Sequence, residues 1–176
     1  MLSPYYTYLY YFPKQAIGTI ITLLLIAGIS WFVFRTMYKK GRISHGRYAS
    51  AVLLVVYILL VSYITFLGRR SIGYYRYNFE IGWSYVDAFI NGNMTTLVEI
   101  GINIILFIPI GFLGVFVFRK NSFWKILLTG ISLSALMEMM QFYMQRGLAE
   151  YDDLISNTIG VVLGSVIALL VKKITR

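Results

Sequence analysis

Five long apolar stretches constrain the fold of this 176-residue chain more than any other feature. They cover about residues 16–38, 48–67, 97–118, 123–144 and 154–171. Each is close to the roughly 20 apolar residues that an α-helix needs to cross a bilayer. Because a lipid-exposed segment must satisfy its own backbone hydrogen bonds, the sequence predicts an all-α, polytopic membrane helix bundle of about five transmembrane helices.

The composition agrees with a membrane protein and argues against a soluble enzyme. Only 13% of the residues are charged and 59% are hydrophobic, whereas soluble domains average about 25% charged residues. So few charged groups cannot cover a water-exposed surface. The chain has no cysteine, which removes thiolate catalysis, cysteine-based metal sites and disulfides from consideration.

The basic residues alternate between the two sides of the predicted membrane. One side holds eleven of them: Arg35, Lys39, Lys40, Arg42, Arg47, Arg119, Lys120, Lys125, Lys172, Lys173 and Arg176. The other side holds five: Lys14, Arg69, Arg70, Arg76 and Arg146. The positive-inside rule therefore predicts an N-terminus outside and a C-terminus in the cytosol. Topology explains the net charge of +9 without a nucleic acid partner.

The chain is expected to form one membrane domain with four parts. Residues 1–15 are an aromatic N-terminus suited to the membrane interface, and residues 16–67 are two anchor helices with few polar side chains. Residues 68–97 are an extracellular loop, and residues 98–176 are a core of three helices. That core carries carboxylates, amides and glycines, so we expect any functional site to lie there.

Polar side chains recur on one face of the third and fourth apolar stretches. Glu99 and Asn103 lie four residues apart, so a helix places them on the same face. Glu138 and Gln141 lie three apart and share a face in the same way. An ionisable side chain inside a membrane is costly and normally faces a cavity or a partner. Glu138 is therefore the sharpest candidate for a functional carboxylate.

The fifth stretch begins in an acidic turn. Asp152 and Asp153 are placed to cap its first helical turn, and Asn157 lies one turn beyond Asp153. A cap is the structural interpretation of these aspartates, and a binding or catalytic role is the functional one. Arg146 is available to pair with Glu138 or with the acids of the turn. The three polar stripes thus predict an outward-facing site near the outer surface.

Proline and glycine positions predict how the core helices meet. Pro109 lies mid-membrane, where it tends to kink a helix, and Gly111 follows it. Gly160 and Gly164 form a small-xxx-small stripe that allows close contact with another helix. We interpret all four as structural residues.

These residues resemble, in order, three patterns of the VanZ-like family over about residues 76–170. Asn103, Phe107, Pro109 and Gly111 resemble N-x-L-x-F-x-P-x-G, and Ser134, Glu138 and Gln141 resemble S-x-x-x-E-x-x-Q. Arg146, Glu150, Asp152, Asp153, Asn157, Gly160 and Gly164 resemble R-x-x-x-D-x-D-D-x-x-x-N-x-x-G-x-x-x-G. Glu150 departs from the usual aspartate, which keeps the charge on a longer side chain.

The resemblance implies a multi-pass protein of the bacterial plasma membrane. The family is named for a member that gives low-level resistance to teicoplanin, a lipid-bearing glycopeptide. We therefore expect a role in lipoglycopeptide resistance through the outward-facing polar site. One alternative is a membrane enzyme that acts on lipid-linked envelope substrates with a carboxylate-bound divalent metal. Another is a non-catalytic envelope assembly subunit.

The candidate residues divide by expected role. Should the protein be an enzyme, the catalytic candidates are Glu138, Asp152 and Asp153. The candidates for substrate binding are Glu99, Asn103, Gln141, Arg146, Glu150 and Asn157. The sequence assigns no cofactor and no metal. The expected partners are the lipid bilayer and either a lipid-linked envelope precursor or a lipoglycopeptide.

Overall fold

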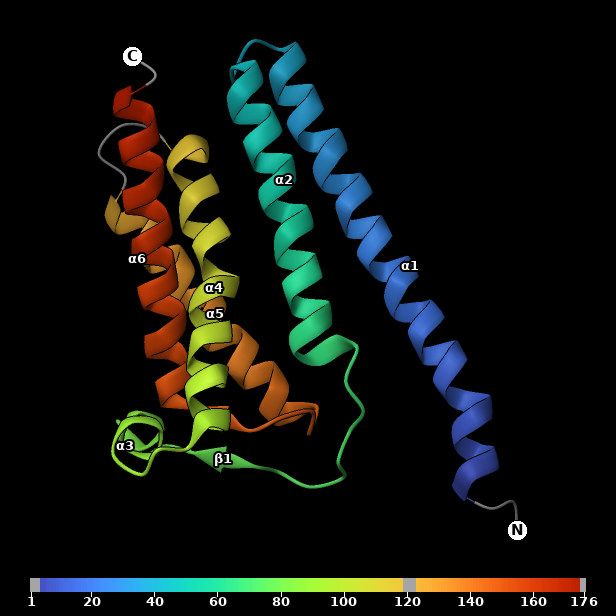
Figure 1. The fold of residues 1–176 in the computed structure, drawn as a ribbon. Coiled ribbons are helices and arrows are strands. Elements are labelled where there is room, and N and C mark those ends of the chain that lie inside the picture. The colour runs from blue at the N-terminus through green and yellow to red at the C-terminus, as the bar shows by residue number, and fades with distance from the viewer. Residues whose placement is uncertain (1–3, 119–122, 175–176) are drawn as a thin grey trace.

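The computed structural model describes residues 4–118 and 123–174, with side chains of the first helix described from residue 19 onward. Within these residues there are six α-helices, a π-helical turn and two very short strands. Their bounds are α1 Pro4–Lys39, α2 His45–Ser62, η1 Tyr63–Leu67, β1 Tyr77–Asn78, α3 Trp83–Phe89, α4 Met94–Val117, α5 Phe123–Tyr143, β2 Ala149–Glu150 and α6 Tyr151–Ile174. Figure 1 shows the long helices running side by side.

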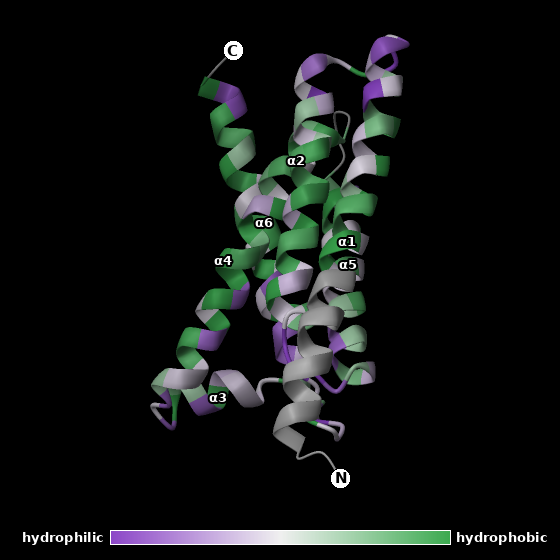
Figure 2. Cartoon of the chain, turned by 90° about the vertical axis from the view of Figure 1, so that its right-hand side faces the viewer, coloured by the Kyte–Doolittle hydropathy of each residue, from purple (hydrophilic) through white to green (hydrophobic). Residues whose placement is uncertain are grey.

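The predicted five-helix membrane bundle is confirmed. Five helical segments are long and apolar enough to cross a membrane, at Thr19–Lys39, His45–Leu67, Met94–Val117, Phe123–Tyr143 and Tyr151–Ile174. These segments differ from the predicted stretches by a few residues at their ends. Hydrophobic residues fill the middle of the helices, and hydrophilic residues gather toward the ends (Figure 2).

The contact between α4 and α6 is the most extensive in the bundle. It depends on glycines at which the two backbones touch. A Cβ atom on Gly164 would collide with the carbonyl oxygen of Ile108, and one on Gly160 would collide with the carbonyl oxygen of Ile104. Gly111 meets the backbone of α6 in the same way. These glycines are required by the close approach of the two helices.

The rest of the core is built around this pair. Four buried side chains, one from each of α2, α4, α5 and α6, belong to one cluster: Val61, Phe107, Met137 and Val161. The hydroxyl of Tyr57 on α2 donates to the carbonyl oxygen of Leu106 on α4 over 3.0 Å. In contrast, α1 packs along α2 and stands away from the other helices (Figure 1).

The segment between η1 and α4 is more structured than the loop expected there. It contains α3, and its strand β1 pairs in parallel with β2, with Tyr77 opposite Ala149. The backbone N–H of Ile72 also donates to the carbonyl oxygen of Gln145 over 2.8 Å. The segment therefore runs beside the connection from α5 to α6.

Some residues used in the topology argument lie outside the described part of the chain. These are Arg119, Lys120 and Arg176. Of the aromatic N-terminus, residues 4–15 belong to α1.

The α4–α6 contact gives a direct test of the packing. Substitution Gly164→Ala should lower the free energy of unfolding by about 1–3 kcal/mol, because the new methyl group forces the backbones apart. Gly101→Ala on α4 is the matched control, since nothing lies within 4 Å of its new Cβ. Thermal unfolding in detergent measures both. Equal unfolding temperatures for the two variants would contradict the close contact.

Candidate functional site

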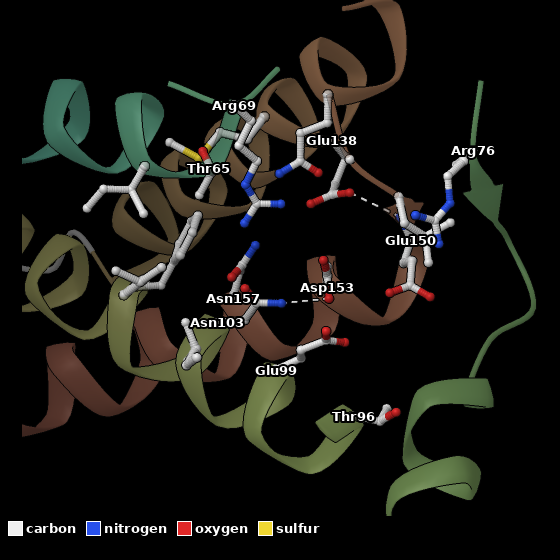
Figure 3. A pocket seen from close by; sticks show the side chains of 18 of the residues that line it. Thr65, Arg69, Arg76, Thr96, Glu99, Asn103, Glu138, Glu150, Asp153 and Asn157 are labelled. Carbon is white, nitrogen blue, oxygen red and sulfur yellow. Dashed lines mark hydrogen bonds between the residues drawn. The ribbon is translucent and has the colours of Figure 1, made fainter. Parts of the chain in front are cut away.

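A cavity of about 510 Å³ lies where η1, the starts of α4 and α6 and the end of α5 come together. We call it the polar pocket, because among the described residues its charged lining consists of Arg69, Arg76, Glu99, Glu138, Glu150 and Asp153. Uncharged polar side chains complete this part of the lining: Thr65, Asn93, Thr95, Thr96, Asn103, Gln141 and Asn157. Figure 3 shows carboxylates from α4, α5 and α6 around one space.

The pocket gathers seven of the nine residues proposed from sequence for catalysis or binding. These seven are Glu99, Asn103, Glu138, Gln141, Glu150, Asp153 and Asn157. The other two, Asp152 and Arg146, do not belong to its lining and bind backbone groups beside it. The helical spacing of the stripes therefore identified a set of side chains that the fold brings together.

Glu138 joins α5 to the start of α6. Its Oε2 accepts a hydrogen bond from the backbone N–H of Glu150 over 3.0 Å. Glu150 belongs to β2, which pairs with β1. This one carboxylate thus fixes the short strand against the end of α5, while Figure 3 shows its other side directed into the pocket.

Two amide side chains link the helices deeper in the pocket. The Nδ2 of Asn103 on α4 donates to Asp153 Oδ1 on α6 over 2.6 Å. The Nδ2 of Asn157 on α6 donates to Ser134 Oγ on α5 over 2.8 Å. Asn157 is buried, and its Oδ1 has no hydrogen-bond partner among the described residues. This oxygen is therefore a buried acceptor without a donor in the described part of the chain.

Asp152 is buried with only 2% of its surface exposed. Its two carboxylate oxygens accept hydrogen bonds from the backbone N–H groups of Gly82 over 2.7 Å and of Ser84 over 2.8 Å. These donors lie at the N-terminus of α3, where a helix has unsatisfied N–H groups and favours negative charge. Asp152 therefore holds α3 against α6 and helps place Trp83 in the pocket lining.

Arg146 plays the corresponding part at the end of η1. Its Nη1 donates to the carbonyl oxygen of Leu67 over 2.9 Å and to that of Phe66 over 3.4 Å. A cation at a helix C-terminus satisfies carbonyls that have no partner within the helix. The pairing with a carboxylate that the sequence suggested is not among its hydrogen bonds within the described residues.

Sequence reasoning missed the two guanidinium groups of the pocket. Arg69 and Arg76 were used only as charges in the topology argument, yet both line the cavity. Figure 3 shows Arg69 pointing toward Glu138, and Arg76 lying beside Glu150. The only signal in the sequence was their position after an apolar stretch, because the segment that carries them has no helical periodicity.

A second group of residues that the sequence did not indicate, around Asp87, holds the start of α4. The carboxylate of Asp87 accepts hydrogen bonds from Thr96 Oγ1 over 2.6 Å and from Asn93 Nδ2 over 2.8 Å. Hydrogen bonding, first from Thr96 and then from Asn91 and Asn93, lowers the pKa of Asp87. This cluster keeps the turn between α3 and α4 in place, and Thr96 also lines the pocket.

Several acids around the pocket repel one another and so determine its electrostatics. Burial, followed by repulsion from Asp153, Glu99 and Asp152, raises the pKa of Glu150 from 4.5 to about 7. A hydrogen bond with Asn78 acts in the opposite direction. Glu150 therefore changes its charge near neutral pH, whereas an ordinary glutamate is fully ionised there.

The carboxylates are spread around the pocket rather than grouped at one point. Among the described residues, no three His, Cys, Asp or Glu side chains are close enough to hold one metal ion. The geometry instead offers separated acceptors, with Arg69 and Arg76 as donors, around a space of about 510 Å³. Such an arrangement suits the binding of a ligand with several polar groups.

An apolar groove of about 330 Å³ adjoins the polar pocket. Its lining includes Glu138 and Glu150, which also line the pocket. The rest is mostly apolar or aromatic: Phe79, Ala135, Met139, Phe142, Tyr143, Ala149, Tyr151 and Leu154. Polar and apolar binding surfaces therefore meet at these two glutamates.

A sequence model of the VanZ/LLP1 family matches residues 19–172, which is most of the chain. No curated protein and no solved structure matches the chain. The matched range includes α2 to α5 in full and all the residues of the polar pocket.

The contact of Asp152 with α3 predicts a local effect. Substitution Asp152→Ala should speed amide hydrogen exchange at Gly82 and Ser84 about tenfold or more, because their charged acceptor is lost. Hydrogen-exchange mass spectrometry in detergent measures this, with the amides of α5 as the internal control. Unchanged exchange at both amides would show that α3 does not depend on Asp152.

The raised pKa of Glu150 predicts a pH dependence of stability. Because the folded state binds this proton more tightly than the unfolded chain, the stabilising contribution is complete below about pH 4.5 and is lost as the pH rises through about 7. The unfolding temperature should therefore fall as the pH rises from about 5 to about 8, a range that includes the raised pKa of Glu150. Glu150→Gln should flatten this decline, whereas Glu80→Gln, an exposed acid outside the pocket, should not. Parallel curves for all three proteins would contradict the assignment.

Proposed function

The chain belongs to the VanZ/LLP1 family, and from this we propose that it is a bacterial plasma-membrane protein that binds a membrane-anchored amphiphile. The polar part of the ligand enters the polar pocket, and its apolar part lies along the apolar groove. The single observation that carries this proposal is that the pocket and the groove meet at Glu138 and Glu150. A ligand with both characters is the simplest match to such a pair of surfaces.

We place the polar pocket at the outer surface of the membrane. The opposite end of the bundle carries most of the described basic residues, including Lys39 at the end of α1, Lys40 and Arg42 after it, and Lys172 and Lys173 at the end of α6. Basic residues favour the cytosolic side. The pocket end has aromatic side chains in contact with one another, such as Tyr77 with Phe79, and aromatic rings favour a membrane–water boundary.

The amphiphile that fits the family best is a lipoglycopeptide of the teicoplanin type. Its acyl tail holds the drug at the outer leaflet, close to its cell-wall precursor target. A protein that binds either the drug or a lipid that the drug requires lowers the effective concentration of drug at that target. This gives low-level resistance without any change to the target itself.

Binding is better supported than metal-dependent catalysis. The enzyme alternative required several carboxylates around one divalent ion, and the described carboxylates are not grouped in that way. The separated donors and acceptors are suited to a ligand that spans the pocket.

The test is drug susceptibility in a sensitive Gram-positive host. Wild-type protein should raise the minimum inhibitory concentration of teicoplanin over empty vector and leave that of vancomycin unchanged. The double variant Glu138→Gln, Asp153→Asn should lose this increase, because two acceptors of the pocket are weakened. Glu80→Gln should keep it, since Glu80 lies outside the pocket lining.

The membrane level of each variant is compared by immunoblot, so that a loss of protein is not mistaken for a loss of binding. Equal protection against teicoplanin and vancomycin would contradict a role for the acyl tail. No protection by the wild-type protein would remove the drug from the proposal.

A further inference from the structure

We propose that the polar pocket binds a primary ammonium group, carried by the headgroup of an amphiphile. This inference deepens the proposed function and depends on it, because it names the chemical group that enters the pocket. It rests on an excess of acceptors over donors in the pocket and on two buried acceptors that no described residue satisfies.

The charges of the pocket do not balance. Among the described residues its lining has four carboxylates, on Glu99, Glu138, Glu150 and Asp153, but only two guanidinium groups. Carboxylates at the end of a membrane bundle are costly unless cations or hydrogen-bond donors compensate them. A cation bound beside the carboxylates would relieve the imbalance there, whereas an anion at the same place would add to it.

An independent observation shows what kind of cation the pocket suits. Asn157 is only 4% exposed and lines the pocket. Its Nδ2 is used by Ser134, and its Oδ1 has no partner among the described residues. A buried acceptor without a donor lowers the stability of the fold. A ligand N–H or O–H group that reached this oxygen from the pocket would therefore satisfy it.

Glu150 adds a second acceptor of the same kind. Its Oε1 is inaccessible to solvent and has no hydrogen-bond partner within the described residues. A primary ammonium has three N–H donors and one positive charge, as on a lysine side chain. It therefore supplies both the charge and the donors that the pocket lacks. A neutral hydroxyl supplies donors only, and a quaternary ammonium supplies charge only.

The two arginines complete the match to a zwitterionic headgroup. Figure 3 shows Arg69 and Arg76 on the side of the pocket near Glu138 and Glu150. Guanidinium groups bind phosphate or carboxylate through paired hydrogen bonds. If the ammonium of a headgroup binds at the carboxylates, the phosphate or carboxylate next to it in the headgroup lies near Arg69 and Arg76, which can donate to it. Phosphoethanolamine is the simplest headgroup with this order of charges.

The experiment compares three headgroups on the full chain. Purified protein in detergent is titrated with short-chain phosphatidylethanolamine, phosphatidylcholine and phosphatidylglycerol, and binding is followed by native mass spectrometry. Phosphatidylcholine is the decisive control, since it keeps the charges of phosphatidylethanolamine but has no N–H donor. We expect phosphatidylethanolamine to bind about tenfold or more tightly than the other two, because charge-assisted hydrogen bonds are lost with them.

The variants separate the pocket from non-specific lipid contact. Glu150→Gln should remove most of the preference for phosphatidylethanolamine over phosphatidylcholine, and Glu80→Gln should leave it intact. Thermal unfolding of each variant checks that it is folded. Equal affinity for phosphatidylethanolamine and phosphatidylcholine, or a preference that survives Glu150→Gln in full, would overturn the inference, as would the absence of binding by all three lipids.

A second arm distinguishes this inference from the proposed function. Teicoplanin is added to the protein loaded with phosphatidylethanolamine. Displacement of the lipid supports one site for both. A preserved lipid preference without displacement supports the ammonium site and contradicts direct binding of the drug there. In a third outcome, all three headgroups bind equally and the double variant Glu138→Gln, Asp153→Asn weakens them by the same factor. This outcome overturns the ammonium inference and leaves amphiphile binding in place.

Discussion

The close approach of α4 and α6 is the constraint on which the rest of the structure depends. With no side chain at Gly160 and Gly164, the backbone of α6 rests on carbonyl groups of α4. This contact fixes both the distance and the register of the two helices. About two turns before Gly160 on α6, Asp153 accepts a hydrogen bond over 2.6 Å from Asn103, which is next to Ile104 on α4. The apolar contact in the middle of the bundle therefore determines the geometry of the polar pocket at its end.

Charged side chains around the pocket stabilise it by binding backbone groups of the neighbouring segments. Asp152 accepts from the start of α3, Arg146 donates to the end of η1, and Glu138 accepts from the amide of Glu150. Each contact satisfies backbone groups at the end of a helix or strand, where partners are otherwise missing. The connecting segments are in this way attached to the helices, and the attachment leaves the remaining carboxylates free to face the cavity.

The sequence predicted those features that follow from local periodicity. The membrane helices are visible because each is an apolar run of sufficient length, and Glu138 and Asn103 are visible because helical spacing puts them on polar faces. Arg69 and Arg76 lie in an irregular segment, so no period relates them to the pocket. Asp152 shows where helical periodicity fails to predict a role. Consecutive residues of a helix are turned by about 100°, so Asp152 and Asp153 face different parts of the protein. Asp153 faces the pocket, whereas Asp152 faces α3.

Glu138 and Glu150 have a position that no other charged residues of the described site share. They line both the polar pocket and the apolar groove, and the hydrogen bond between them joins α5 to β2. An amphiphile that occupies both surfaces must pass these two side chains, so recognition of its head and of its tail is coupled there. Because burial and acidic neighbours raise the pKa of Glu150 to about 7, the charge at this junction responds to what binds beside it. A ligand cation would favour the ionised form, and the junction would then hold the ligand more tightly.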